Sequence, residues 1–182
     1  SCLASAGNDG TLRLWDVKSG VLLHTLKEHK HAVSSVCFSR DGGWLATGSE
    51  DKSVKVWNAS GLHLRHHANQ DQHHHITNTN ASSSSSVSIT LLQSLEEHKD
   101  VVNSVCFSPD GQSIYFTSDR SGGPQIYKMN LDGGDLKRLT YGGNYNISPS
   151  VSPDGKMLAY ISRREGKFQL HVLDLITSQE QR

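Results

Sequence analysis

The sequence carries no excess of charge of either sign. Its 182 residues include 18 Lys and Arg against 18 Asp and Glu, so the formal net charge is zero. A nucleic-acid binder needs a strongly basic surface, because much of its affinity comes from contacts with phosphates. The balance therefore excludes a polybasic nucleic-acid binder and an acidic tail protein, and we expect no nucleic-acid partner.

Long apolar runs are also missing. No stretch of the sequence approaches the ~18 consecutive apolar residues that a membrane-spanning helix requires, so we expect no membrane insertion. The opening string SCLASAG has no Met and no leader pattern, and it begins inside a strand-like run. We therefore expect the chain to be cut from a longer sequence.

Cysteines are few. The three thiols are Cys2, Cys37 and Cys106, and an odd number in a chain of this size does not indicate a disulfide framework. Cys37 and Cys106 both lie in the string SVCFS, between apolar residues. We expect them to be small buried free thiols.

The sequence also lacks the common catalytic and cofactor motifs. It contains no phosphate-binding G-x-x-x-x-G-K-[ST] loop, no G-x-G-x-x-G, no H-E-x-x-H, no G-x-S-x-G and no C-x-x-C. Its aspartates at turn positions are expected to satisfy backbone donors nearby rather than to serve in acid–base catalysis; these are Asp9, Asp41, Asp51, Asp110 and Asp154. We therefore predict neither an enzyme nor a cofactor.

What the sequence does contain is repetition. The string LASAGNDGTLRLWD at residues 3–16 returns as LATGSEDKSVKVWN at residues 45–58, and SPDG at residues 108–111 returns at residues 152–155. These offsets are 42 and 44 residues. A third pair, around the two SVCFS strings, is 69 residues apart because a low-complexity tract intervenes. Repeats of this period indicate a solenoid, a propeller or an array.

Each period holds several runs of 5–8 residues rich in Val, Ile, Leu, Thr and Tyr, which are separated by DG, GG and SG turns. Such runs predict short antiparallel strands, and no longer stretch shows a period near 3.6 residues, so we expect essentially no helix. Four strands per ~43 residues correspond to one propeller blade. The fold class is therefore all-β, built of four-stranded antiparallel propeller blades.

The strings DGTLRLWD, SRDGGWLATGSEDKSVKVWN and HKDVVNSVCFSPDG resemble the WD40-repeat family, a likeness that covers residues 1–111 apart from the tract between them. In that family each blade is tied by hydrogen bonds among a His, a Ser or Thr, an Asp and a Trp. The resemblance implies that His29, Thr47 or Ser49, Asp51 and Trp57 form this set, with Asp9, Trp15 and His98 as counterparts in other blades.

From residue 112 the character of the sequence changes. The strings FTSDRSGGPQIYKMNLDGG and SPSVSPDGKMLAYIS resemble the TolB-like propeller repeats of the Gram-negative periplasm, over residues 112–178. The SPDG string occupies the same position of the repeat in both parts of the sequence. This indicates a hybrid or chimeric propeller, and an engineered origin is the preferred interpretation.

The predicted organisation is one continuous propeller-type domain. It consists of WD40-like blades at 1–59, a disordered His- and Ser-rich insertion at 60–87, WD40-like strands at 88–111 and TolB-like blades at 112–182. Imidazoles in the insertion suit metals, with His73, His74 and His75 as weak candidates. Adjacent histidines in such a tract have no fixed geometry, so no functional metal site is expected.

Counting the runs gives about fourteen strands, or about 3.5 blades, with the first strand of the first blade and the last strand of the last blade missing. An open arc leaves strand edges and blade faces uncovered. Three outcomes follow: two copies close a ring of about eight blades, the four partial blades form a small ring, or the chain is a marginal fragment. We prefer the homo-oligomer that closes a ring.

The WD40 resemblance implies a non-enzymatic scaffold with protein or peptide partners. The binding face would be lined by the turns before each first strand and after each second strand. The candidates on this face are Asn8, Lys30, His31, Glu50, Lys99, Asp100, Arg120 and Tyr145. Arg163, Arg164 and Lys167 are expected to form a solvated hairpin tip.

Two alternatives remain open. One is a periplasmic TolB-like module that binds peptidoglycan-associated lipoprotein, as the second resemblance implies. The other is a designed protein without an evolved function. The location depends on which half governs: cytoplasmic or nuclear for the WD40-like half, and periplasmic for the TolB-like half.

Overall fold

Short strands joined by tight turns make up almost all of the structure, as the alternating apolar runs predict. The computed structural model describes residues 1–63, 89–96 and 101–181. Within those ranges it holds fifteen β-strands, one short 3₁₀ helix, η1 (Ser60–His63), and no α-helix. No helix there is long and apolar enough to cross a bilayer.

The strands pair in chain order into four antiparallel sheets, which we call blades 1 to 4. Blade 1 has three strands, β1 (Cys2–Ala6), β2 (Leu12–Asp16) and β3 (Leu22–Leu26). Blade 2 has four, β4 (Val33–Phe38), β5 (Trp44–Ser49), β6 (Val54–Asn58) and β7 (Thr90–Leu95). Blade 3 consists of β8 (Val102–Phe107), β9 (Ser113–Ser118), β10 (Gln125–Asn130) and β11 (Lys137–Arg138). Blade 4 consists of β12 (Asn146–Val151), β13 (Met157–Arg164), β14 (Lys167–Asp174) and β15 (Glu180–Gln181).

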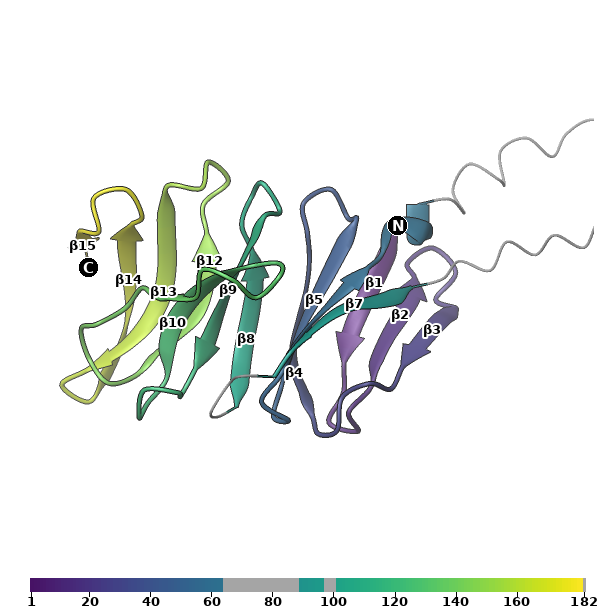
Figure 1. Ribbon diagram of the computed structural model, residues 1–182, viewed down its shortest axis with the longest axis horizontal. Coiled ribbons are helices and arrows are strands. Elements are labelled where there is room, and N and C mark those ends of the chain that lie inside the picture. Colours follow the sequence, from purple (N-terminus) through teal and green to yellow (C-terminus); the bar gives the residue numbers. More distant parts are fainter. Residues whose placement is uncertain (64–88, 97–100, 182) are drawn as a thin grey trace, which may run out of the picture.

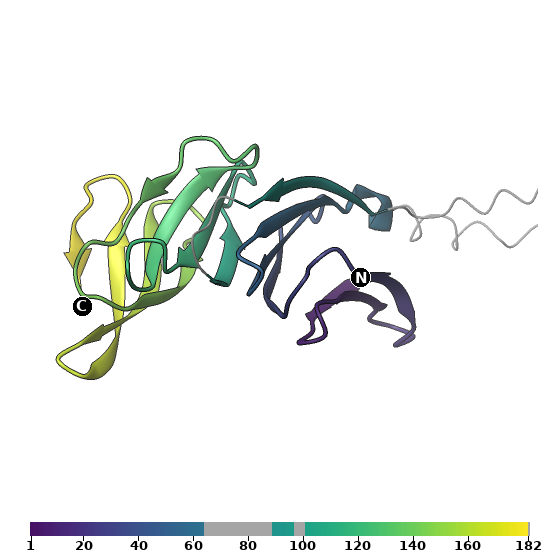
Figure 2. The same ribbon diagram turned by 60° about the horizontal axis from the view of Figure 1, so that its bottom comes forward.

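The blades stand side by side in chain order and form an open arc, with blade 1 at one end and blade 4 at the other (Figure 1). Figure 2 shows the same succession from a second direction. The first strand of one blade lies against the first strand of the next, β4 against β8 and β8 against β12, and β1 lies against β4. The all-β, partial-propeller prediction is confirmed.

The strand count differs from the prediction at the C-terminal end. Blade 4 has a fourth strand, because β15 pairs with β14 through Val172–Gln181 and Leu173–Glu180. The strand is only two residues long and both are polar, so no apolar alternation announces it. Backbone pairing at the edge and the side chain of Glu180 hold it in place.

The Ser-x-Asp-Gly turns explain why the blades share a phase. In the turn between the first two strands of blades 2, 3 and 4, the Ser hydroxyl donates to the Asp carboxylate at 2.5–2.6 Å. The glycine that follows has a positive φ of 70–74°, which glycine adopts without steric cost. The same three residue types therefore build the same corner in the WD40-like and the TolB-like blades.

The predicted insertion falls between the third and fourth strands of blade 2, since β6 pairs with β7 from Val54–Leu95 to Asn58–Thr90. Its first four residues form η1. The rest of it, with His73, His74 and His75, lies outside the described residues.

Candidate partner-binding face

Blade 2 is tied by a chain of buried hydrogen bonds. The Trp57 Nε1–H donates to the hydroxyl of Thr47 at 3.1 Å, and that hydroxyl lies 2.7 Å from His29 Nε2. His29 Nδ1 lies 2.9 Å from Asp51 Oδ2, which also accepts the backbone N–H of Lys30. Thr47 is fully buried and His29 nearly so. A neutral His29 with its proton on Nδ1 satisfies every partner in this chain.

The protonation states agree with that geometry. Burial lowers the pKa of His29 below its usual 6.5, although Asp51 acts in the opposite direction. Burial alone would raise the pKa of Asp51, but hydrogen bonds from Ser53, Lys30 and His29 hold it well below its usual range. The pair is therefore a neutral imidazole beside a carboxylate, which stabilises the blade and leaves no free base.

The two hydroxyls that the sequence offered for this set have different roles. Thr47 joins Trp57 to His29, whereas Ser49 donates to the carbonyl of Ala32 at 2.8 Å and accepts the N–H of Asp51. Ser49 therefore fixes the turn after β5.

Blade 1 repeats part of the arrangement. Trp15 Nε1–H donates to Ser5 Oγ at 2.9 Å, so Ser5 stands where blade 2 has Thr47. Asp9 accepts the backbone and hydroxyl of Thr11 and pairs with Arg13 Nη2 at 2.5 Å. His98, the counterpart expected in blade 3, lies outside the described residues.

Blade 3 is tied differently. Its register places Phe116 where blade 2 has Thr47, and the guanidinium of Arg120 follows where blade 2 has Asp51. Arg120 Cζ lies 5.5 Å from the ring centre of Phe116 and 4.9 Å from that of Tyr127. Within the described part of blade 3, cation–π contacts therefore occupy the positions that carry hydrogen bonds in blade 2. Arg120, which we predicted on the partner-binding face, is half-buried and packs against these two rings.

Blade 4 holds a polar cluster that the sequence did not reveal. Glu180 on β15 accepts the hydroxyl of Tyr160 at 2.8 Å, pairs with Arg164, and lies 2.5 Å from Nδ1 of the fully buried His171. Burial and the Glu180 carboxylate raise the pKa of Tyr160. Arg164 thus closes the last blade and is not part of a solvated hairpin tip.

Four of the residues predicted for a binding face lie in the turns of blades 1 and 2. Asn8, Lys30, His31 and Glu50 are exposed. The backbone N–H of Glu50 donates to Ala32 O at 3.0 Å, and Val33 N–H donates to Gly7 O at 3.0 Å, so the turns of blades 1 and 2 meet there. Lys99 and Asp100 lie outside the described residues.

The corresponding turns of blade 4 line a hollow. Its volume is about 350 Å³, and it is lined by Asn144, Tyr145, Arg163, Glu165 and Gly166. Asn144 and Tyr145 precede the first strand of the blade, and Glu165 and Gly166 follow the second. Tyr145 was predicted on this face, and Arg163 was predicted only as part of a solvated hairpin tip. The other three residues were missed, although the same rule about turns would have found Asn144 and Glu165.

A tight hairpin sets the shape of this hollow. Arg164 pairs with Lys167 at the end of β13 and β14, which leaves a two-residue turn with φ of 52° at Glu165 and 78° at Gly166. Two positive φ values are the signature of a type I′ turn, whose twist matches that of the strands. The paired strands of this hairpin therefore continue further than those of blades 2 and 3, whose β5 and β9 have six residues against eight in β13.

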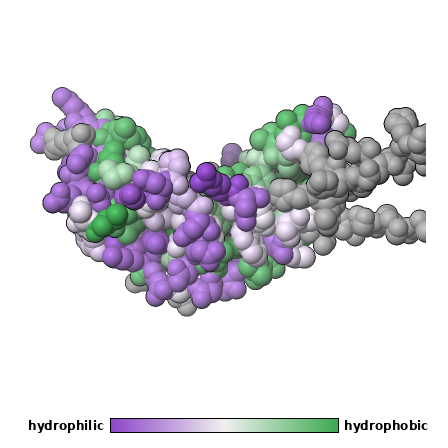
Figure 3. All heavy atoms as spheres, turned by 90° about the horizontal axis from the view of Figure 1, so that it is seen from above, coloured by the Kyte–Doolittle hydropathy of each residue, from purple (hydrophilic) through white to green (hydrophobic). Residues whose placement is uncertain are grey.

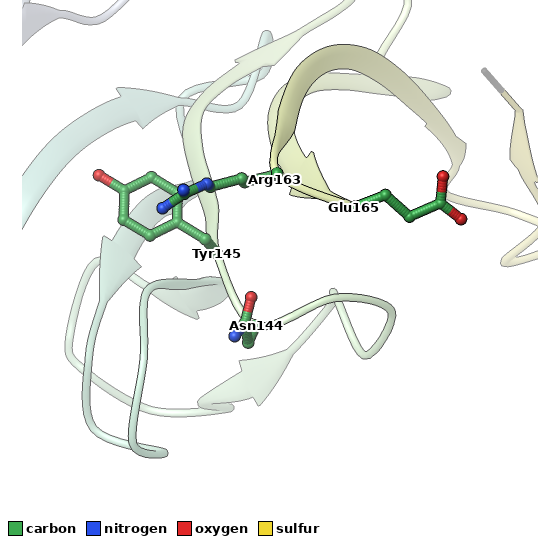
Figure 4. Close-up of a pocket in the computed structure, with 5 residues that line it drawn as sticks. Asn144, Tyr145, Arg163 and Glu165 are labelled. Carbon is green, nitrogen blue, oxygen red and sulfur yellow. The ribbon is translucent and has the colours of Figure 1, made fainter.

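Aromatic and charged groups meet inside it. Figure 4 shows Arg163 reaching toward the ring of Tyr145, while Glu165 points the other way. The rings of Tyr145 and Phe168 meet edge to face at 5.8 Å, and Arg163 Cζ lies 5.7 Å from the centre of Phe168. A guanidinium beside exposed rings can bind a carboxylate and an apolar group at the same time.

A second hollow of about 250 Å³ lies between blades 2 and 3. Its lining includes Leu95 and Glu96 from blade 2 and Arg120, Met129 and Leu136 from blade 3. Arg120 therefore faces this inter-blade hollow and is not among the residues that line the hollow at Tyr145. Among the described residues, no cluster of three or more His, Cys, Asp or Glu side chains could hold a metal ion.

Comparison with known proteins agrees with this architecture. The family model "TolB beta propeller domain" matches residues 56–182, and the model "WD domain, G-beta repeat" matches residues 1–16 and 20–58. Human apoptotic protease-activating factor 1 is 33% identical over 159 residues, which are 84% of this chain and 10% of that protein. The Tol-Pal system protein TolB of Bordetella pertussis is 79% identical over 29 residues, 16% of this chain and 7% of that protein.

Among solved structures, TolB from Acinetobacter baumannii superposes with a TM-score of 0.64 at 21% identity, covering 98% of this chain and 39% of that one. The chain thus spans only a minor part of the proteins it matches, and this structural likeness shows the fold alone. The chain is a β-propeller protein that belongs to the TolB β-propeller family, whose model matches residues 56–182, and its residues 1–16 and 20–58 are similar to WD40 repeats.

Proposed function

We propose that the chain is a non-enzymatic protein–protein interaction scaffold that binds a protein or peptide along the rim of turns described above. WD40 and TolB propeller repeats are generally interaction modules, and the chain contains both. Rigid blades hold the rim turns at fixed spacing, which lowers the entropic cost of ordering a binding surface.

The observation that carries the proposal is the hollow at Tyr145. It lies on the face where the turns of blades 1 and 2 expose Asn8, His31 and Glu50. It combines a guanidinium, an amide and the half-buried ring of Tyr145, which contacts the exposed ring of Phe168. The ligand class that fits is an extended peptide with an acidic residue next to an aromatic or aliphatic one. The carboxylate would pair with Arg163 while the apolar side chain packs on Tyr145.

Panning the purified chain against a phage-displayed random peptide library tests this. We expect enrichment of acidic–apolar peptides by the wild type, loss of enrichment by Arg163→Glu, and retention by Arg40→Glu. Arg40 is a matched control, because it is exposed in the turn between β4 and β5, at the opposite end of the strands. Absence of enrichment, or equal loss in both variants, would refute the proposal.

An alternative is a periplasmic TolB-like module that binds peptidoglycan-associated lipoprotein; its support is the TolB family model over 56–182. Titration of the purified soluble domain of that lipoprotein by calorimetry separates the two: saturable binding supports the alternative. In either case location follows function, cytoplasmic or nuclear for the first and periplasmic for the second. A designed hybrid without a partner would bind neither probe.

Self-association is the other part of the proposal. The arc is open, and its two end blades expose large apolar side chains, including Leu3 and Leu22 in blade 1 and Phe168 and Leu170 in blade 4. A homo-oligomer that closes the ring would cover them.

A further inference from the structure

Each pair of neighbouring blades packs through the same two faces. In blade 2 the leading face carries Leu45 and Trp57, and the trailing face carries Ala46, Val54 and Val56. Because side chains alternate along a strand, these two sets point to opposite sides of one sheet. All five side chains are at most 2% exposed, so both faces are covered within the chain.

The pattern occurs at all three junctions. Leu12 and Leu14 of blade 1 pack on the leading face of blade 2. The trailing face of blade 2 packs on Ile114 and Met129 of blade 3, which stand where blade 2 has Leu45 and Trp57. Tyr115 and Ile126 of blade 3 pack on Leu158 and Leu173 of blade 4 in the same way. A trailing face always meets a leading face.

Among the described residues, no other blade packs against the leading face of blade 1. Its register aligns Leu3, Trp15 and Leu22 across the three strands, at the positions that Leu45, Trp57 and Leu91 hold in blade 2. Leu3 is 57% exposed and Leu22 is 44% exposed, against 0% for Leu45.

At the other end of the arc, no blade in the described part of the chain packs against the trailing face of blade 4. Its register aligns Ile147, Ile161 and Leu170, and Ala159 with Val172. Leu170 is 60% exposed, whereas the equivalent Val54 in blade 2 is fully buried. Figure 3 shows hydrophobic atoms at both ends of the curved body.

We propose that the leading face of blade 1 in one copy docks on the trailing face of blade 4 in a second copy, head to tail. This continues the interface that the chain already forms three times within itself, with Leu3, Trp15 and Leu22 meeting Ile161, Leu170 and Val172. Two copies joined at both ends give the eight-bladed ring. The inference rests on the proposed self-association and not on peptide binding at the rim.

The area covered at the two junctions is compatible with a dimer of this chain. Three strands of five residues, at about 4.8 Å spacing and about 3.3 Å per residue, give a blade 1 face of roughly 250 Å² in projection. A two-copy ring has two junctions, so each copy covers roughly 500 Å² in projection. Side-chain relief makes the accessible area larger, which brings it near the ~800 Å² per partner of stable complexes.

Sedimentation of single and mixed variants tests both the association and its polarity. Leu3→Glu blocks the leading face and Leu170→Glu blocks the trailing face, and both side chains are exposed, so neither change opens a core cavity. Ile176→Glu is the control, because Ile176 is 74% exposed in the turn between β14 and β15. Circular dichroism of each variant verifies that the blades are folded.

We expect the wild type and Ile176→Glu to sediment at twice the chain mass of 20.0 kDa. Each blocking variant alone should lose the closed ring and sediment as a monomer. An equimolar mixture of the two should associate more than either variant alone, in a concentration-dependent way, through the single intact pair of faces. A monomeric wild type overturns both the inference and the self-association. A dimer lost in only one of the two variants, or in neither, overturns the head-to-tail faces but leaves self-association standing.

Discussion

Thr47 is the side chain on which the hydrogen bonding of blade 2 depends most. Its hydroxyl accepts from Trp57 Nε1 and faces His29 Nε2, and all three groups are at most 8% exposed. Thr47→Val keeps the shape of the side chain and removes only the hydroxyl. The change therefore isolates the polar contribution from packing.

The expected cost follows from the two groups left without a partner. The Trp57 donor and the His29 acceptor are buried, and an unsatisfied buried polar group costs about 1–3 kcal/mol. The sum is about 2–6 kcal/mol, a large part of the stability of a small domain. For a chain of this size we expect the melting temperature to fall by roughly 6–12 °C, taking about 3 kcal/mol as the central value.

Urea unfolding followed by tryptophan fluorescence measures the loss of unfolding free energy directly. Thr117→Val is the matched control, because Thr117 is also fully buried in a central strand, but its hydroxyl has no hydrogen-bond partner. We expect that control to be neutral or slightly stabilising. A Thr47→Val protein within 0.5 kcal/mol of the wild type, or equal effects at the two sites, would refute the reasoning.

Three further predictions concern titrating groups. Since the folded pKa of His29 lies below its usual 6.5, the unfolded chain binds more protons in that window. The contribution of His29 to stability is therefore present above pH 6.5 and lost as the pH falls below it. We expect His29→Gln to weaken the dependence of the urea midpoint on pH between about pH 7 and 5. An unchanged pH dependence of the midpoint would contradict this. Glu180→Gln should loosen β15 and so increase the rate of amide hydrogen exchange in β14, as measured by mass spectrometry. Equal exchange rates in the variant and the wild type would show that Glu180 does not hold β15 in place. Burial and the neighbouring Cys37 raise the pKa of Cys106 to about 12. We therefore expect iodoacetamide to label Cys106 only after unfolding, whereas labelling of the folded protein would show the thiol to be accessible.

Much of the fold could be predicted because its signals are local and repeated. The 42-residue offset, the Asp-Gly corners and the alternation of apolar residues each depend on a few neighbouring positions. The set of His29, Thr47, Asp51 and Trp57 was predicted from family likeness, and the structure places these four side chains in one hydrogen-bonded chain. Only the choice between Thr47 and Ser49 needed coordinates, because both hydroxyls lie on the same face of β5.

The features that escaped prediction are those that depend on long-range placement. Glu180 reads as a residue of a polar tail, yet it is the common partner of Tyr160, Arg164 and His171, which lie up to 20 residues away in the chain. Arg163 and Phe168 meet only because the β13–β14 hairpin is long and tightly turned. The run of basic residues at this hairpin does not predict that Arg164 pairs with a carboxylate while Arg163 lies over an aromatic ring.

The claim underlying the whole account is that the WD40-like and TolB-like blades form one body through the junction of blades 2 and 3. Gly48 tests it, because a Cβ there would lie 2.9 Å from Val102 Cγ1 and 3.0 Å from Val105 Cγ1 across that junction. Trp15, Trp44 and Trp57 all lie in blades 1 and 2, so fluorescence reports that half, while far-ultraviolet circular dichroism reports every blade. In the wild type we predict coincident urea transitions by the two probes, and in Gly48→Ala we predict that both shift together by about 1–3 kcal/mol. Two separate transitions in the wild type, or a shift in only one probe, would show that the halves fold independently and would contradict the account.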